Sequence, residues 1–442
     1  MSTTTRVLSA LLLAAALGLS LAMLQPDAAA IAAAVARPVG KLWLNALQMT
    51  VVPLVAALVV LGVNTASDAA ASGRTARSAI VVFLILLSLA AAFAAAFAPA
   101  FLSLLPRDPD MMHALRSAME PAAAPAAAPG LADWLSGIVP SNAIAAAAQS
   151  AMLPLVVFAL FFGFALTRID AEHKAQLLRL VQGIADTMIV IVRWVLWAAP
   201  LGVFALVLAV SATVGLHMLS ALAYYILMQC AMYVAVTLLL YLVARTAGGE
   251  PIRRFALAIA PAQAIAASTQ SSLASLPAMV ESARTRLGYP LSVTSLVLPM
   301  AVSLFRITSP IQYIGVAAFI AWASGIEPSI LQWTAASALA VVVSMGSVGL
   351  PGQVSFMATT MPVVQTLHLP VEPLGILLAV DTIPDVFATV GNVTADLTAT
   401  SVVAKRSPAE GLPTSATQWT AAADDNGVLP HDGVNTSDPP AS

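Results

Sequence analysis

The sequence predicts an all-α membrane protein that crosses the bilayer many times, and its composition is the first observation that supports this. Of its 442 residues, 60% are hydrophobic and only 9% are charged, whereas a soluble domain carries about 25% charged residues. The second observation is a series of apolar stretches long enough to span a bilayer, which takes about 20 residues each. The third is that Lys and Arg gather in some of the intervening loops and are scarce in others.

We expect eight of the apolar stretches to form transmembrane helices and two to form re-entrant helical hairpins. The stretch after Arg6 is expected to be the first transmembrane helix, because it is long and lacks a convincing cleavage site for a signal peptide. The ten stretches cover residues 7–31, 42–64, 79–105, 142–167, 184–212, 218–244, 255–283, 290–323, 330–370 and 373–404.

Several other classes of protein are excluded by the composition. A net charge of −2 gives no basic footprint for nucleic acid. The single cysteine, Cys230, excludes a disulfide framework within the chain. The five histidines are scattered without the spacing of metal ligands.

The positions of Lys and Arg predict the orientation in the membrane. Cations cluster at Arg74 and Arg77, at Arg168 to Arg179, at Arg245 to Arg254, at Arg284 and Arg286, and at Lys405 and Arg406. Because cytoplasmic loops carry an excess of Lys and Arg, placing these clusters inside puts both termini in the cytoplasm.

The stretch 255–283 has cations at both ends, so it is expected to start and finish on the cytoplasmic side. Its middle, "AIAASTQSSLASLP", is rich in serine and ends at a proline. The stretch 330–370 contains "SMGSVGLPGQVS" and no cation. Two such broken segments are typical of a transporter binding site, because irregular backbone at membrane depth needs protein or a water-filled cavity beside it. Two kinked but otherwise ordinary helices are the alternative.

The last stretch carries a polar face. On a helix of 3.6 residues per turn, its polar side chains fall within about 80° of arc, opposite Ile383, Val390, Val393 and Leu397. A charged side chain in the bilayer must face a cavity or a partner, so this face predicts a binding site; hydrogen bonding between packed helices is the structural alternative. The polar residues are Asp381, Asp385, Thr389, Asn392 and Asp396.

These residues, "DTIPDVFATVGNVTADLTAT", resemble the last-helix motif D-x-x-x-D-x-x-R-T-x-x-N-V-x-x-D of the dicarboxylate/amino acid:cation symporter family, which has the glutamate-transporter fold. The resemblance extends over most of residues 7–405. It includes "NALQMTVVPLV" (45–55), "PSNAIAAAAQSAMLPLVVFALFFGFAL" (140–166), "AAPLGVFALV" (198–207) and the hairpin tips at 265–277 and 344–355.

The resemblance implies a homotrimer in which each protomer has a scaffold and a mobile transport domain that moves as an elevator. The implied scaffold comprises helices one and two (1–78) and helices four and five (106–217), with a Pro/Ala-rich loop at 106–139. The implied transport domain comprises helix three (79–105), helix six (218–250), the first hairpin (251–289), helix seven (290–323), the second hairpin (324–371) and helix eight (372–404). Residues 405–442 are expected to be a disordered cytoplasmic tail.

Carried over by position, the resemblance implies the following substrate contacts. Asp385 and Thr389 hold an ammonium group, and Asn392 holds its α-carboxylate. This agrees with chemistry, since an anion and a hydroxyl suit an ammonium and an amide NH₂ suits a carboxylate. Further contacts are implied for the hairpin tips and the seventh-helix motif, at Ser271, Ser272, Gly349, Leu350 and Ser309.

The sequence departs from the family pattern at three places. Ala388 stands where the family has an arginine that binds acidic side chains, which favours a neutral or atypical substrate. Phe305 and Ile307 replace two oxygen-bearing residues that help to bind sodium in the family, and Leu87 replaces a threonine, while the adjacent Ser88 is kept for cation coupling. The implied sodium motif is therefore degraded at Phe305, Ile307 and Leu87, and no metal site is assigned.

Arg306 is a cation that the family pattern lacks. It either forms a permanent ion pair with Asp396 or contacts the substrate. The three departures make the site one charge more positive than the family pattern, so it needs fewer bound cations. Asp396, Asn392 and Ser88 are the candidate cation-coupling residues, and the coupling cation is H⁺ or Na⁺.

The sequence thus predicts a secondary-active symporter for a small amino acid or dicarboxylate in a bacterial inner membrane, with reduced sodium dependence. It is not expected to be an enzyme, because its aspartates share one helix instead of meeting as a dyad. The expected partners are a small solute, the lipid bilayer and two further copies of the chain, with no nucleic acid and no other cofactor. A binding protein or sensor without coupled transport is the alternative.

Overall fold

The computed structural model of this protein describes residues 3–71, 73–105, 136–214, 217–346 and 352–406, and its regular elements in these ranges are helices. In hydrocarbon every backbone N–H and C=O must pair within the protein, and a helix does this locally. Six described segments are long and apolar enough to cross a membrane, and the expected all-α polytopic membrane fold is confirmed. They are Pro26–Ala71, Arg74–Ser103, Ala171–Trp197, Ser220–Thr246, Leu291–Ser324 and Thr382–Arg406.

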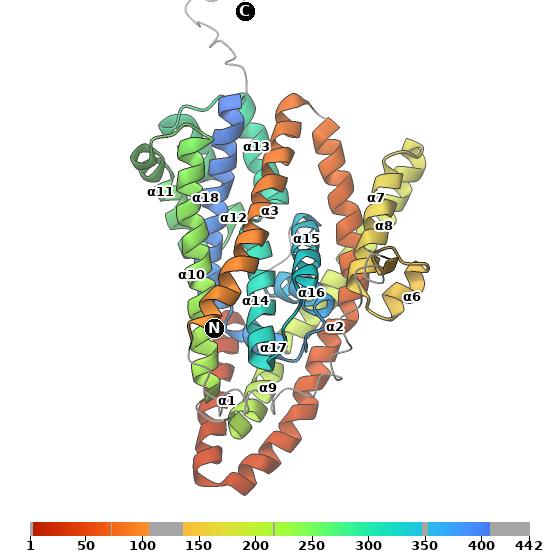
Figure 1. Ribbon diagram of the computed structural model, residues 1–442, viewed down its shortest axis with the longest axis vertical. Helices are drawn as coiled ribbons and strands as arrows, with labels where there is room; N and C mark the ends of the chain where they lie inside the picture. Colours follow the sequence, from red (N-terminus) through yellow and green to blue (C-terminus); the bar gives the residue numbers. More distant parts are fainter. Residues whose placement is uncertain (1–2, 72, 106–135, 215–216, 347–351, 407–442) are drawn as a thin grey trace, which may run out of the picture. The chain divides into compact units, whose positions relative to one another are not determined.

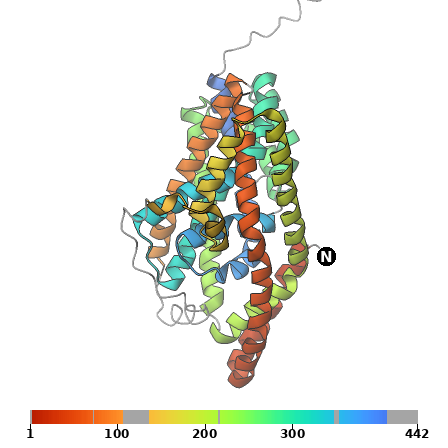
Figure 2. The ribbon, with the colours of Figure 1, turned by 90° about the vertical axis from the view of Figure 1, so that its right-hand side faces the viewer.

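The first three helices are α1 (Thr3–Leu24), α2 (Pro26–Ala71) and α3 (Arg74–Ser103). The first predicted span ran to residue 31, but α1 ends at Leu24 because Pro26 opens the next helix, a position that proline favours. The predicted linker between the first two spans is helical and belongs to α2, which at 46 residues is roughly 70 Å long. Figures 1 and 2 show α1 beside the first part of α2, at the end of the helical bundle (residues 3–406) opposite α11.

The middle of the chain forms α6 (Ala143–Ala148), α7 (Met152–Leu166), α8 (Ala171–Trp197), α9 (Ala199–Val214) and α10 (His217–Thr246). The predicted single span 184–212 is wrong, since the helix breaks at Ala198. Pro200 is compatible with this break, because proline has no N–H to donate and is tolerated in the first turn of a helix, here that of α9. Helix α9 packs against both α1 and α2.

The contact between α2 and α9 depends on a residue without a side chain. The Trp43 indole donates a hydrogen bond to the Val195 carbonyl oxygen at 3.0 Å, and its ring lies over Gly202 of α9. A Cβ at Gly202 would overlap that ring. We expect Gly202→Ala to destabilise the protein by about 1–3 kcal/mol, as overpacking does, measured as a lower melting temperature in detergent.

Gly183 of α8 is the matched control for this substitution. A Cβ there meets nothing within 4 Å, so Gly183→Ala should leave the melting temperature unchanged or raise it slightly, since alanine favours a helix. Equal melting temperatures for the Gly202→Ala variant and the unmodified protein would contradict the packing described for Trp43.

Two helix pairs fold back on themselves. Helix α11 (Ile252–Thr269) is followed by α12 (Ser272–Glu281) and the π-helix η1 (Ser282–Arg286), with a turn at Gln270 and Ser271. The serine-rich sequence therefore breaks the helix as expected. Helices α15 (Ile330–Gly346) and α16 (Gly352–Thr366) also contact each other. The residues between them, including Gly349 and Leu350, lie outside the described ranges.

The two ends of the first hairpin are tied together at its base. Arg254, in the first turn of α11, donates a 2.9 Å hydrogen bond to the Leu287 carbonyl oxygen just after η1. Its guanidinium also lies 3.5 Å from the carboxylate of Glu250. The hairpin thus starts and finishes at one place, which agrees with the cations that flank it in the sequence.

The last third of the chain contains α13 (Leu291–Leu304), α14 (Thr308–Ser324), α17 (Pro373–Val380) and α18 (Thr382–Arg406). The predicted span 290–323 is interrupted at residues 305–307, and the predicted span 373–404 has a junction at Asp381. Helix α18 continues through Lys405 and Arg406, which the sequence had assigned to the tail. Most of the expected loop 106–139, and the tail from residue 407 on, lie beyond the part that the structure describes.

Helix α18 is enclosed by other helices. It packs most extensively on α10 and also on α11, α13, α3 and α12, and Figure 1 shows it running alongside α10 and α11. Since these helices surround it, polar side chains on α18 face protein and not lipid. This enclosure positions the candidate site.

Candidate functional site

The polar face of α18 is buried. Asn392 is 3% exposed, Thr389 4% and Asp396 0%, while Asp385 is partly exposed. The opposite face is also covered, because Val393 and Leu397 belong to an apolar cluster with residues of α11 and α12. The polar residues therefore line an interior surface that opens toward Asp385.

The break between α13 and α14 meets this face at Asn392. The Thr308 N–H, at the start of α14, donates a 3.1 Å hydrogen bond to the Asn392 Oδ1. A backbone N–H can only donate, so the oxygen of the Asn392 amide is fixed on Thr308 and the NH₂ group points elsewhere. No described residue accepts a hydrogen bond from that NH₂ group in the structure. It is a donor suited to a carboxylate.

Thr389 and Asp385 form the neighbouring part of the site. The Thr389 hydroxyl donates to the backbone oxygen of Asp385 at 2.8 Å. Its oxygen lone pairs stay available to accept a hydrogen bond beside the Asp385 carboxylate, a combination that suits an ammonium group. Ser309 is buried at 5% exposure, and its N–H donates to the Arg306 carbonyl oxygen at 3.0 Å.

Arg306 lies in the break and is partly exposed. It acts electrostatically on Asp381, Asp385 and Asp396. Among the described residues, however, its guanidinium forms no hydrogen bond, and no ion pair within 4.0 Å joins it to any of them. Both carboxylate oxygens of Asp396 lack a described hydrogen-bond partner. The permanent Arg306–Asp396 pair is therefore not formed in this structure.

The place of the implied sodium ligands is filled by apolar side chains. Phe305 stacks on Phe83 of α3, with ring centroids 4.7 Å apart and planes 7° from parallel. Ile307 and Leu87 are also in the core. Ser88 is exposed, about 140° around α3 from Phe83, so it does not join Phe305 and Ile307 in one site. These side chains do not fit a sodium ion, which needs oxygen ligands.

The tip of the first hairpin reaches the start of α18. The Gln270 side-chain amide donates a 3.0 Å hydrogen bond to the Thr382 carbonyl oxygen, one turn before Asp385. The neighbouring Ser271 caps α12, since its hydroxyl oxygen accepts from the Ala274 N–H at 3.2 Å. The tip serines, Ser271 and Ser272, are therefore brought to the same end of α18 as Asp385.

Asp381 lies at the junction of α17 and α18 with helical backbone, one turn before Asp385, whose N–H donates to the Asp381 carbonyl oxygen at 3.0 Å. The Gln312 side-chain amide of α14 donates to both of its carboxylate oxygens, at 2.9 and 3.0 Å. Sequence reasoning missed this contact and also the bond of Gln263 to Thr394 at 2.8 Å. One pattern in the sequence could have indicated that polar side chains lie around α18. Polar residues recur every four positions on α10, at Tyr225, Gln229, Tyr233, Thr237 and Tyr241.

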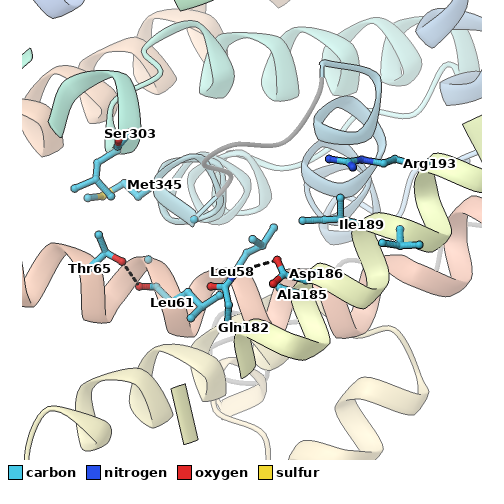
Figure 3. Close-up of a pocket in the computed structure, with 14 residues that line it drawn as sticks. Leu58, Leu61, Thr65, Gln182, Ala185, Asp186, Ile189, Arg193, Ser303 and Met345 are labelled. Atoms are coloured by element: carbon cyan, nitrogen blue, oxygen red, sulfur yellow. Dashed lines mark hydrogen bonds between the residues drawn. The ribbon is translucent and has the colours of Figure 1, made fainter. Parts of the chain in front are cut away.

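A separate cavity of about 540 Å³ lies between α2 and α8 on one side and the ends of α13 and α15 on the other. Figure 3 shows Arg193 reaching from α8 toward this space and the hydrogen bond of Gln182 to Asp186 at 2.9 Å. None of the expected substrate residues lines it; it ends at Leu304, just before the break, and at Gly346.

The sequence matches the sodium:dicarboxylate symporter family over residues 4–406. The chain belongs to this family. Its membership confirms the resemblance found in the last-helix motif, and makes the protein a multi-pass membrane protein of a family of transporters.

Three curated relatives of the symporter family illustrate the similarity. The Proton/glutamate-aspartate symporter of Escherichia coli (strain K12) is 29% identical over 83% of this chain and 84% of its own. The Proton/sodium-glutamate symport protein of Bacillus caldotenax is 27% identical over 84% of this chain and 88% of its own. The C4-dicarboxylate transport protein of Laribacter hongkongensis (strain HLHK9) is 25% identical over 84% of this chain and 83% of its own.

Among the positions of the family motif, Ala388 is the one that leaves the α18 face without a cation. It is 6% exposed and belongs to the main apolar core. A cation that acts on the carboxyl groups of this face is Arg306, which comes from the break between α13 and α14.

Proposed function

We propose that this protein is a secondary-active symporter that carries a small amino acid or dicarboxylate across the bacterial inner membrane. The observation that carries the proposal is the Asn392 amide, whose oxygen is committed to Thr308 and whose NH₂ group is left for a carboxylate. Thr389, one turn away, and Asp385, two turns away, supply an acceptor and an anion for an ammonium group. Together these groups match the two ends of an α-amino acid.

The charge count favours a substrate without a side-chain carboxylate. With every carboxyl ionised, Asp381, Asp385 and Asp396 carry three negative charges against the single positive charge of Arg306. A zwitterionic amino acid adds no net charge, whereas a dicarboxylate adds two negative charges to a buried site. Burying uncompensated charge is costly, so the neutral substrate is preferred.

The second candidate is an acidic substrate, and the observation that favours it is Arg306. Its guanidinium has no ion-pair partner in the described structure and could take the extra carboxylate in place of Ala388. The names of the relatives, which refer to glutamate, aspartate and C4-dicarboxylates, point the same way.

We further propose that protons replace sodium as the coupling cation. The Phe83–Phe305 stack removes oxygen ligands from the implied sodium site, while Asp396 is fully buried and has no described donor. A buried carboxylate without a partner gains most from binding a cation. Asp396, with Asn392 one turn before it, is the proposed cation site beside the substrate.

The proposed transport movement is an elevator motion of one domain against a scaffold. The scaffold comprises residues 1–78 and 106–217, and the moving domain comprises 79–105 and 218–404, in a homotrimer with both termini in the cytoplasm. Support comes from the enclosure of α18 by α10, α11, α13 and α3, all assigned to the moving part.

Uptake by purified protein in liposomes tests this function. We expect a proton gradient, and not a sodium gradient, to drive accumulation, because the sodium ligands are replaced by Phe305 and Ile307. Within a panel of radiolabelled amino acids and dicarboxylates, neutral amino acids should be accumulated most. Accumulation that requires sodium and ignores pH would contradict the proposed coupling.

A binding protein without transport is the competing function. Its supporting observation is that Arg306 acts on three carboxyl groups at once, which could hold the helices in one arrangement. Ligand-dependent thermal stabilisation without any uptake or exchange in liposomes would favour this function.

A further inference from the structure

The carboxyl group of Asp381 is buried in a setting that the substrate site does not explain. Asp381 is 8% exposed and lies at the junction of α17 and α18. Its hydrogen-bond donor is the neutral amide of Gln312, at 2.9 and 3.0 Å from the two oxygens. No cation lies within 4.0 Å of it among the described residues. A purely structural carboxylate at this depth is usually paired with a cation.

The side of α10 that faces Asp381 is polar but uncharged. Tyr225 and Tyr233 are fully buried, and Gln229, between them on the same face, donates to the Tyr233 hydroxyl at 3.4 Å. The Tyr225 hydroxyl is close enough to act electrostatically on the Asp381 carboxyl, and it has no hydrogen-bond partner among the described residues. The titratable and charged groups that act in this region are Tyr225, Tyr233 and Cys230 from α10, Asp385 from α18 and Arg306 from the break.

These neighbours provide partners for both protonation states of Asp381. The Gln312 amide donates to the ionised carboxylate and also to the carbonyl oxygen of the acid. A tyrosine hydroxyl donates to the carboxylate or accepts from the acid. The Gln229 Oε1, which has no described donor, is a further acceptor in the cluster. A proton can therefore bind and leave without stranding a buried polar group.

We propose that Asp381 binds one of the protons that this protein transports. The proposal rests on the proposed proton-coupled symport and adds a second proton site to that at Asp396. The proton joins a carboxylate oxygen of Asp381 on one side of the membrane and leaves it on the other.

The position of Asp381 links this proton to the substrate. Asp385, the proposed ammonium ligand, follows one helical turn later, and its N–H donates to the Asp381 carbonyl oxygen at 3.0 Å. The two carboxyl groups repel each other when both are ionised. A proton on Asp381 together with an ammonium group at Asp385 removes both charges. The site that holds both the proton and the substrate is then the state that needs the least free energy to cross the membrane.

The test compares Asp381→Asn with the unmodified full-length protein in liposomes, with the membrane potential clamped at zero by potassium and valinomycin. Asparagine keeps the shape and accepts from Gln312, and it also suits the start of a helix as well as aspartate does. At a gradient of one pH unit, each coupled proton contributes about tenfold to the limiting accumulation of substrate. We expect the accumulation ratio to fall about tenfold in Asp381→Asn, with substrate counterflow retained.

An unchanged accumulation ratio in Asp381→Asn would overturn this proposal and leave the proposed function intact. Absence of pH-driven accumulation in the unmodified protein would instead refute the proposed function. The two failures are therefore distinguishable in one set of measurements.

A second variant keeps the proposal testable if Asp381→Asn does not fold. Gln312→Met removes the amide donor but keeps the carboxyl group, so the ionised state loses its hydrogen bond. We expect the pH of half-maximal uptake to rise in this variant. Tyr241→Phe is the matched control, because Tyr241 lies on the same helix, α10, but on a different face and bonds to Gln263; it should leave that pH unchanged. Identical pH profiles for Gln312→Met and Tyr241→Phe would overturn the assignment of Asp381.

Discussion

Asp385→Asn is expected to weaken strongly the binding of any substrate that carries an ammonium group. The carboxylate is mostly enclosed, next to a Thr389 hydroxyl that already donates to the backbone. Removing one partner of a buried, hydrogen-bonded charge pair costs about 2–5 kcal/mol, and 1.4 kcal/mol corresponds to tenfold. Affinity for the amino acid should therefore fall by roughly 30- to 3,000-fold, measured by isothermal titration or scintillation proximity binding.

Asp186→Asn is the matched control for this substitution. Asp186 is an exposed carboxylate on α8 that accepts a 2.9 Å hydrogen bond from Gln182 and lies outside the proposed site. It should bind the amino acid as the unmodified protein does. If Asp385→Asn bound every amino acid in the panel as tightly as the unmodified protein does, Asp385 would not be the ammonium ligand.

Phe305→Ala is expected to give the largest loss of stability. The Phe305 ring is 1% exposed, and it stacks on Phe83, which is 0% exposed. Truncating a buried phenylalanine to alanine costs about 3–5 kcal/mol, through lost burial and the cavity left behind. The melting temperature in detergent should fall accordingly, and Phe83→Ala should have a similar effect.

The double variant and a surface variant sharpen this prediction. Because the two rings contact each other, the losses in Phe83→Ala and Phe305→Ala should add up to more than the loss in the double variant. Phe161→Ala serves as the control, since Phe161 of α7 is 63% exposed and should change the melting temperature little. Strict additivity would mean that the rings do not stabilise each other across α3 and the break.

The membrane class and the polar face of α18 could be predicted because both depend on local regularities of the chain. Apolar length determines whether a segment can span a bilayer, and the 3.6-residue period places Asp385, Thr389, Asn392 and Asp396 on one side. The turn at Gln270 was also expected, since serine-rich sequence there competes with the helix for backbone hydrogen bonds.

The contacts between helices could not be predicted, because they depend on how separate elements meet. Nothing in the order of residues indicates that the Asn392 amide caps α14 at Thr308, or that Gln312 holds Asp381. Ser88 shows the same limit within one helix. It neighbours Leu87 in sequence, but a step of one residue turns it by about 100°, away from the core that Leu87 and Phe83 share.

The turn at Gln270 links the shape of the first hairpin to its place on α18. Gln270 has a left-handed backbone, with φ of 51°, which costs a residue with a side chain about 1–2 kcal/mol. Its hydrogen bond to the Thr382 carbonyl oxygen stabilises the turn by about 0.5–1.5 kcal/mol. The two amounts nearly cancel while the tip is docked. The left-handed turn is therefore stabilised by its contact with α18, and loss of that hydrogen bond would leave the backbone cost at Gln270 uncompensated.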